Sequence, residues 1–158
     1  MGMNDLYHEL NFELAPFAGA APQITCTDFA AFNTQFATAL DTAGYEANMF
    51  VLYFSHINNA TVYTFQMFES DASAVAAGTA VAAADVLVRR DDGDVTDCPV
   101  ATGILTMAGA VSEHHFYTFQ YTGRRRWIHM VCGGGTGEDF TPGMITIQAK
   151  GRREPANV

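Results

Sequence analysis

The chain has 158 residues, of which 49% are hydrophobic and only 16% charged, and its formal net charge is −9. A chain of this length buries about two-thirds of its surface without metals or disulfides, which excludes a disordered or fibrous protein. The acidic balance opposes nucleic-acid binding, and no window of about 18 residues is free of polar side chains, as a membrane span requires. We therefore expect a single domain over residues 1–158 that binds neither nucleic acid nor a membrane.

The charges are unevenly distributed along the chain. Residues 1–88 contain nine acids and no Lys or Arg, whereas residues 89–158 hold all eight cations together with the other eight acids. Any cation that pairs with a partner's carboxylate must therefore come from the second part of the chain.

The first forty residues combine an expected arm with two competing periodicities. We expect residues 1–25 to form an N-terminal arm, and residues 24–27 are a weak candidate strand. Phenylalanines at 29, 32 and 36 recur near helical spacing, but residues 32–40 also alternate with period two. The alternation favours a strand in this segment.

The strongest strand patterns begin at residue 49. Residues 49–54 (MFVLYF) form a continuous apolar run, which is typical of a strand covered on both faces. Residues 55–59 (SHINN) are expected to be the loop of a hairpin to the next strand, residues 63–68, in which alternate side chains are apolar. The Ala-rich residues 71–85 favour either a short helix or an extended arm.

The second half of the chain continues the strand pattern. Candidate strands cover residues 104–107, 115–121, 127–132 and 144–149. The glycines of residues 133–137 (GGGTG) predict a long loop over residues 133–143, and residues 150–158 are expected to be an extended tail. The pattern predicts an all-β, single-domain antiparallel β-sandwich, jelly-roll-like, with long loops and extended termini.

The candidate metal ligands lack the spacing of known sites. His115 and His129, with an acid, would be the ligands of a cupin-type metal-dependent enzyme, but the adjacent His114 and His115 point to opposite faces of a strand. The acidic residues 91–97 suggest calcium but lack EF-hand alternation, which favours a solvated loop. The three cysteines are widely spaced without a CxxC pair, so we expect small apolar thiols and no zinc site.

No motif of nucleotide binding or of nucleophilic catalysis is present. The GGGTG segment is followed by Glu138 and Asp139, which would repel a phosphate, and it lacks the Lys of a phosphate-binding loop. No G-x-S-x-G elbow occurs. Neither nucleotide binding nor hydrolase chemistry therefore has specific support in the sequence.

The basic residues late in the chain are the candidate partner-binding residues. Arg124, Arg125 and Arg126 stand before Trp127, and guanidinium groups at the start of a strand can make bidentate contacts with carboxylates on another chain. An alternative is a solvated turn that prevents pairing between sheet edges. Arg152 and Arg153, near the C-terminus, extend the basic signal.

Four short segments resemble a known group of proteins in their order. They are residues 41–46 (DTAGYE) leading into 49–52 (MFVL), residues 65–71 (FQMFESD), residues 121–128 (YTGRRRWI), and a closing strand that ends in 151–153 (GRR) with Pro155. This order, over residues 38–155, is similar to a group of small virion proteins of tailed bacteriophages that are usually encoded beside the major capsid protein.

The resemblance implies a structural protein of the phage head, with no enzymatic activity, no catalytic residues and no cofactor. It would be a cement or decoration protein, made in the host cytoplasm, that binds the major capsid protein on the outer capsid surface as a homotrimer. The alternatives are a head-to-tail connector or tail-tube protein, the cupin-type enzyme above, and a glycan-binding sandwich in which Trp127 and exposed tyrosines form stacking surfaces.

Overall fold

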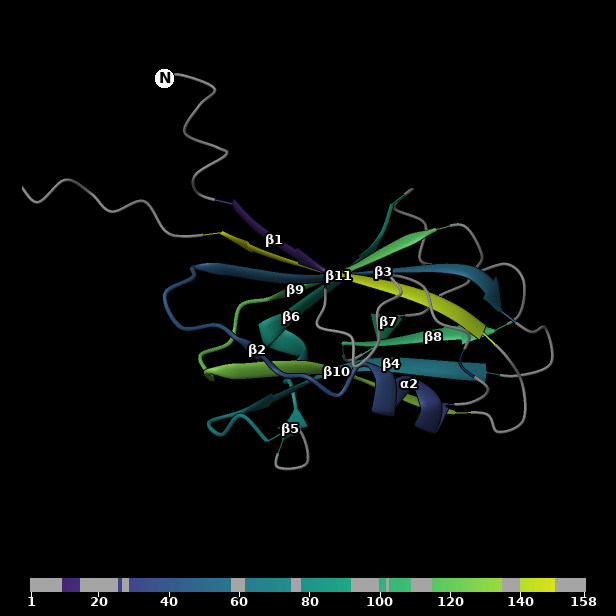
Figure 1. Cartoon of the computed structure of the whole chain (residues 1–158), viewed down its shortest axis with the longest axis horizontal. Coiled ribbons are helices and arrows are strands. Elements are labelled where there is room, and N and C mark those ends of the chain that lie inside the picture. The colour runs from purple at the N-terminus through teal and green to yellow at the C-terminus, as the bar shows by residue number, and fades with distance from the viewer. Residues whose placement is uncertain are drawn as a thin grey trace, which may run out of the picture.

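Two antiparallel sheets lie face to face in the computed structural model (Figure 1), which describes residues 10–14, 26, 29–57, 62–74, 78–91, 100–101, 103–108, 115–134 and 140–149. The five-stranded sheet has the order β1-β11-β3-β9-β6. Its strands are β1 (Leu10–Leu14), β11 (Phe140–Ala149), β3 (Ala47–Ile57), β9 (Phe116–Tyr121) and β6 (Val86–Arg90).

The six-stranded sheet has the order β2-β10-β4-β8-β7, and β5 also pairs with β4. Its strands are β2 (Leu40–Asp41), β10 (Trp127–Gly134), β4 (Val62–Ser70), β8 (Ile104–Ala108), β7 (Val100–Ala101) and β5 (Thr79–Ala80). Two helical segments complete the described chain, the α-helix α2 (Phe29–Gln35) and the 3-10 helix η2 (Ala83–Asp85). No helix among the described residues is long and apolar enough to cross a membrane.

The strand order confirms the predicted sandwich and its jelly-roll character. The strands β1-β11-β3-β9 of one sheet face β2-β10-β4-β8 of the other, so the chain alternates between the sheets as in a jelly roll. The strands β6 and β7 extend the two sheets at the ends next to β9 and β8.

The core is a layer of aromatic side chains between the sheets. The predicted alternation is confirmed in β4 and β9, where every second residue is buried: Tyr63, Phe65 and Met67, and Tyr117, Phe119 and Tyr121. The ring of Phe140 lies near the centre of this layer, with its centroid 4.5 Å from that of Tyr63 and 6.3 Å from that of Phe54. Both sheets therefore pack on one aromatic residue.

The strand expected within residues 29–40 was wrong, because residues 29–35 form helix α2. Phe32 and Phe36 are one helical turn apart and both are buried against the aromatic layer, with their ring centroids 4.5 Å apart. The side chain of Asn33 donates to the carbonyl of Cys132 and accepts from its N–H group, both at 2.8 Å. These contacts fix the helix to β10, which the periodicity alone could not indicate.

The hairpin expected at residues 55–59 was also wrong. The strand β3 continues to Ile57 and pairs with β9 and β11, whereas β4 belongs to the other sheet. The connection therefore crosses between sheets, because each strand finds its hydrogen-bonding partners far away in sequence. The strand β3 is also not fully covered on both faces, since Met49, Val51 and Tyr53 on its outer side are only partly buried.

Several segments of irregular sequence take part in the sheets. Residues 10–14, within the expected arm, form β1 and pair with β11. The Ala-rich segment is neither a single helix nor an arm, because it contains β5 and η2. Part of the predicted glycine loop is wrong, since Gly133 and Gly134 end β10 and Phe140 begins β11. At Gly134, φ is +118° and a Cβ would lie 2.3 Å from the Val62 carbonyl oxygen, so only glycine fits.

Cys26 and Cys132, the two described cysteines, form no disulfide, and both side chains are buried, as expected of small apolar residues. Burial is the largest cause that raises the pKa of the Cys132 thiol above its usual range. Cys98, the part of the acidic loop that follows Asp91, and the tail at 150–158 lie outside the described residues.

We predict that Phe140→Ala lowers the free energy of unfolding by about 3–5 kcal/mol, because it leaves a cavity between the sheets. The matched control is Ile145→Ala on the same strand, whose side chain is 40% exposed and whose loss should change stability by less than about 1 kcal/mol. Urea unfolding measures both changes. Equal losses in the two variants would contradict the central position of Phe140.

Candidate functional site

The candidate site is the turn of residues 122–126 between β9 and β10, here called the arginine turn. Tyr121, the last residue of β9, is buried, and its hydroxyl group donates to the Glu69 carboxylate at 2.6 Å and accepts from the N–H group of Arg125 at 2.8 Å. A Cβ on Gly123 would lie 2.4 Å from the Tyr121 ring. The chain therefore passes closely over this ring, and Tyr121 holds the arginine turn against the core.

The turn that follows β2 supports the arginine turn from the other side. The N–H group of Thr42 donates to the carbonyl of Arg126 at 2.7 Å, and the Thr42 hydroxyl reaches the carbonyls of both Arg125 and Arg126 at 2.9 Å. The N–H group of Thr122 donates to the carbonyl of Asp85 at 2.8 Å. Three donors thus hold the backbone of the turn in one conformation: the N–H group of Thr42, the Thr42 hydroxyl shared between two carbonyls, and the N–H group of Thr122.

Arg126 binds an acid of the same chain. Its Nε and Nη2 atoms contact the Asp41 carboxylate at 3.1 and 2.9 Å, as a planar fork. The hydrogen bond from Arg126 is the largest cause that lowers the pKa of Asp41. The guanidinium carbon of Arg126 also lies 5.2 Å from the centroid of the half-buried Trp127 ring, a cation–π contact. Trp127 is therefore partly covered by its own neighbour.

The remaining two arginines differ in their partners. Arg125 pairs with Asp71 at the surface. Arg124 is exposed and has no ion-pair partner among the described residues.

Arg124 lines an open cleft of about 390 Å³ together with Tyr45, Glu46 and Asn48. Glu46 is also exposed and unpaired within the described part of the chain. The cleft therefore offers a partner one free guanidinium group and one free carboxylate.

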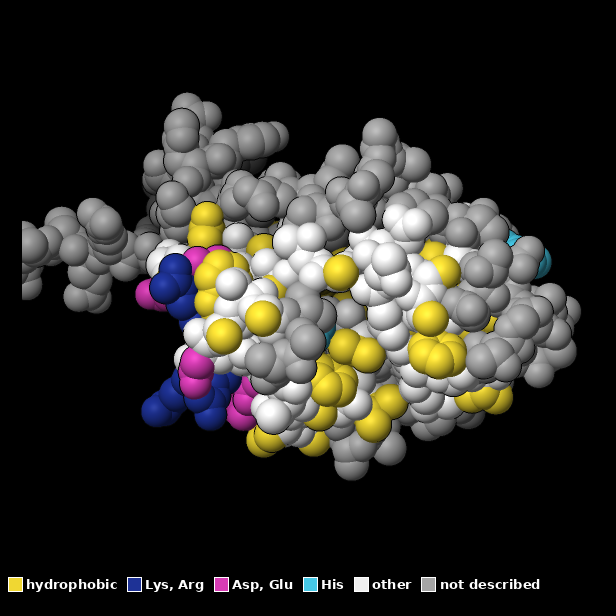
Figure 2. All heavy atoms as spheres, turned by 60° about the horizontal axis from the view of Figure 1, so that its bottom comes forward, with side chains coloured by type: hydrophobic (Ala, Val, Ile, Leu, Met, Phe, Trp, Pro, Cys, Tyr) yellow, Lys and Arg dark blue, Asp and Glu magenta, His cyan; other side chains and the backbone are white. Residues whose placement is uncertain are grey.

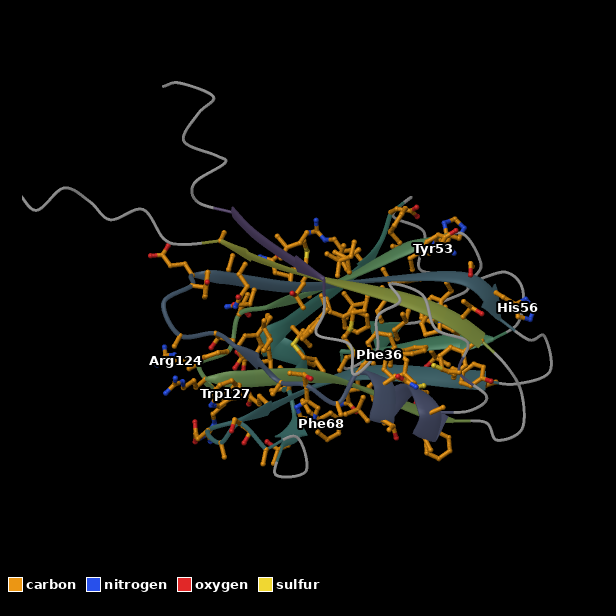
Figure 3. The ribbon with its side chains drawn as sticks, viewed as in Figure 1. Phe36, Tyr53, His56, Phe68, Arg124 and Trp127 are labelled. Carbon is orange, nitrogen blue, oxygen red and sulfur yellow. The ribbon has the colours of Figure 1, made fainter. Side chains whose placement is uncertain are left out.

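Three of the sequence segments that carry the virion resemblance meet at this end of the sandwich. Residues 41–46 supply Asp41 and Thr42, residues 65–71 supply Glu69 and Asp71, and residues 121–128 supply the arginines. Figure 2 shows the Lys and Arg side chains of this face gathered at one end with acidic side chains among them. Figure 3 places Arg124 and Trp127 together there, with His56 at the opposite end.

The sequence indicated the arginines but not the groups that bind them. Asp41 and Arg126 are 85 residues apart, and Glu69 and Tyr121 are 52 apart. Nothing in the local pattern joins them, although Asp41 and Asp71 both stand in turn-like segments. Arg152 and Arg153 lie outside the described residues.

The structure does not bring the two candidate metal-binding histidines together. His115 precedes β9 in the five-stranded sheet, and its Nδ1 atom lies 2.9 Å from the Asp91 carboxylate. His129 belongs to β10 in the six-stranded sheet, which does not contain β9. No group of three or more His, Cys, Asp or Glu side chains among the described residues could hold a metal ion.

His129 occupies an unusual position on the outer side of the six-stranded sheet. It is 2% exposed because the Ala-rich segment covers it: a Cβ on Gly78 would lie 2.6 Å from its ring, and the Phe68 ring is 5.7 Å away between centroids. Its Nδ1 atom is buried without a hydrogen-bond partner. Burial lowers the pKa of His129 below its ordinary value.

Comparison with protein families, with curated proteins and with solved structures finds no match to this chain. What the protein does is therefore inferred from its own residues.

We predict that Tyr121→Phe destabilises the fold by about 1–3 kcal/mol, because the partly buried Glu69 carboxylate and Arg125 N–H group lose their partner. Glu69→Gln keeps an acceptor for the Tyr121 hydroxyl and should therefore lower the free energy of unfolding by less. Urea unfolding of the two variants and the parent measures the difference. Parent-like stability of Tyr121→Phe would contradict the role given to its hydroxyl.

We predict that stability falls as the pH is lowered through the ordinary histidine value of 6.5. Because the pKa of His129 is lower in the folded chain, the unfolded chain takes up the proton first. The contribution of neutral His129 to the free energy of unfolding is therefore fully present above pH 6.5. It is lost as the pH falls toward the pKa of His129 in the folded chain, with a slope of at most about 1.4 kcal/mol per pH unit. His129→Phe should flatten this slope in urea unfolding between pH 7.5 and 5.5, while the exposed-site control His56→Ala should keep it.

Proposed function

We propose that the protein is a structural virion protein, a capsid cement or decoration protein that binds the outer surface of a phage head. The observation that carries this proposal is the convergence of three of the resembling segments on one end of the sandwich, where they build and hold the arginine turn. Segments that carry a family resemblance and also meet in space are expected to serve one role. A docking surface is such a role.

The chemistry of this end fits the docking of a protein surface. The backbone of the arginine turn is held by Tyr121 and Thr42, so little conformational freedom remains to be lost when a partner binds. Arg124 and Glu46, which carry opposite charges, both line this cleft. The partner would present a carboxylate to Arg124 and a hydrogen-bond donor to Glu46.

All three arginines, Arg124, Arg125 and Arg126, were predicted to contact a partner. In the structure they differ in the ion pairs that they form within the chain. Arg125 and Arg126 are held by Asp71 and Asp41 of the same chain and therefore act first in shaping the turn. Arg124 is the guanidinium group that can bind a capsid carboxylate without losing a partner. In a lattice of many copies, modest contacts of this kind add up to firm attachment.

We predict that Arg124→Ala weakens binding to shells assembled from the major capsid protein alone by about tenfold, the loss typical of a charge-assisted hydrogen bond. The matched control is Arg89→Ala, which removes another exposed cation from β6 and should leave binding within about twofold. Co-sedimentation of purified protein with the shells measures both.

The thermal unfolding of both variants should match the parent, because neither side chain is buried. Raising the ionic strength should weaken parent binding. Failure of the parent to bind shells, or equal effects of the two substitutions, would contradict the proposal. A copy number of only about a dozen per virion would also contradict the proposal, because that number is expected of a connector ring.

A further inference from the structure

The outer face of the five-stranded sheet is unusually apolar. Residues that point away from the core on β3, β9, β6 and β11 form what we call the apolar outer face: Val51, Tyr53, Leu87, Phe116, Ile145 and Ile147. Leu87, Phe116 and Ile145 are 42%, 46% and 40% exposed, and the other three are half-buried. Of the four large hydrophobic side chains exposed in the described chain, three belong to this face.

The strand register makes these residues neighbours. Ile145 stands opposite Val51, and Ile147 stands opposite Met49, across the pairing of β11 with β3. Tyr53 stands opposite Phe116, with the two ring centroids 5.1 Å apart. Figure 3 shows Tyr53 on the side of this sheet that faces away from the second sheet. The face therefore spans four strands, with Thr118 and Gln120 of β9 between the apolar side chains of β3 and Leu87 of β6.

The charges on the apolar outer face indicate which kind of partner binds it. Its described outward positions on β3, β9, β6 and β11 carry no Asp or Glu, although the chain has a net charge of −9, and they carry one cation, Arg89 on the outermost strand β6. A partner of opposite charge would be matched by a charged face. An apolar face without carboxylates is complementary to a second copy of itself, because two copies then meet without opposing acidic groups, and Arg89 lies only on the outermost strand.

The size of the face is sufficient for a weak pair. Four strands at about 4.8 Å and six residues of β9 at about 3.4 Å give a face of roughly 400 Å², which lies among the largest apolar patches found on monomers. Two such faces would bury about 800 Å² in total, which is the size of a weak and reversible protein interface.

We propose that two copies of this chain associate through the apolar outer faces of their five-stranded sheets, around a two-fold axis. Thr118 and Gln120 lie on the same face between β3 and β6 and supply polar groups that can pair across the axis. This pairing is two-fold, in contrast to the homotrimer expected from the sequence resemblance. It requires no capsid and can therefore be tested independently of the proposed function.

The test is the mass of the purified protein in solution, measured by sedimentation over a concentration range of about 1–100 µM without shells. The parent chain should form a species of twice the 17.1 kDa of one chain as the concentration rises. Ile145→Glu should weaken this association by at least tenfold, because each interface would then bury two unpaired carboxylates. Leu87→Glu, on a different strand of the same face, should have the same effect.

The matched control is Val62→Glu, which introduces the same charge at a side chain that is 50% exposed on the six-stranded sheet. It should leave the association unchanged. Thermal unfolding at 1 µM should be similar for the three variants, which shows that the substitutions do not unfold the chain. A parent that stays monomeric throughout, a parent that forms a trimer, or equal weakening by Val62→Glu would overturn the proposal.

Discussion

The packing of aromatic rings between the two sheets is the constraint on which the other features depend. Phe140 contacts Phe54 from its own sheet, Tyr63 from the opposite sheet and Phe32 from helix α2. Because these rings share one layer, the separation of the sheets and the position of the helix are set together. The same rings fill the interior that the strands enclose. The surfaces available for recognition are therefore the ends of the sandwich and the outer faces of its sheets.

Tyr121 connects this core to the candidate site. Its ring belongs to the buried layer, while its hydroxyl group reaches Glu69 and the backbone of the arginine turn. The position of the turn thus follows from the packing of the core, and the ion pairs of Arg125 and Arg126 hold the side chains around it. A docking surface built in this way loses little conformational entropy on binding. The proposed attachment to a capsid shell requires a surface that is ordered before it binds.

The two proposed surfaces have different chemistry and therefore different partners. The end with the arginine turn is polar and offers Arg124 and Glu46, whereas the apolar outer face has no acidic side chain at its described outward positions. The first fits a charged protein surface and the second fits a copy of itself. A chain that uses both would link neighbouring attachment points on a lattice, so that each contact supports the others through effective concentration.

The sequence by itself determined the elements whose pattern is local. Period-two alternation identified β4 and β9 and their buried faces, since side-chain direction in a strand follows directly from residue order, and the succession of strand patterns and turns predicted a sandwich. Only the tertiary structure decided that residues 29–35 are helical, that β3 and β4 lie in different sheets, and that Asp41 holds Arg126. Each of these depends on contacts between residues far apart in the chain. Such contacts are selected by how the whole core packs, and no local periodicity records them.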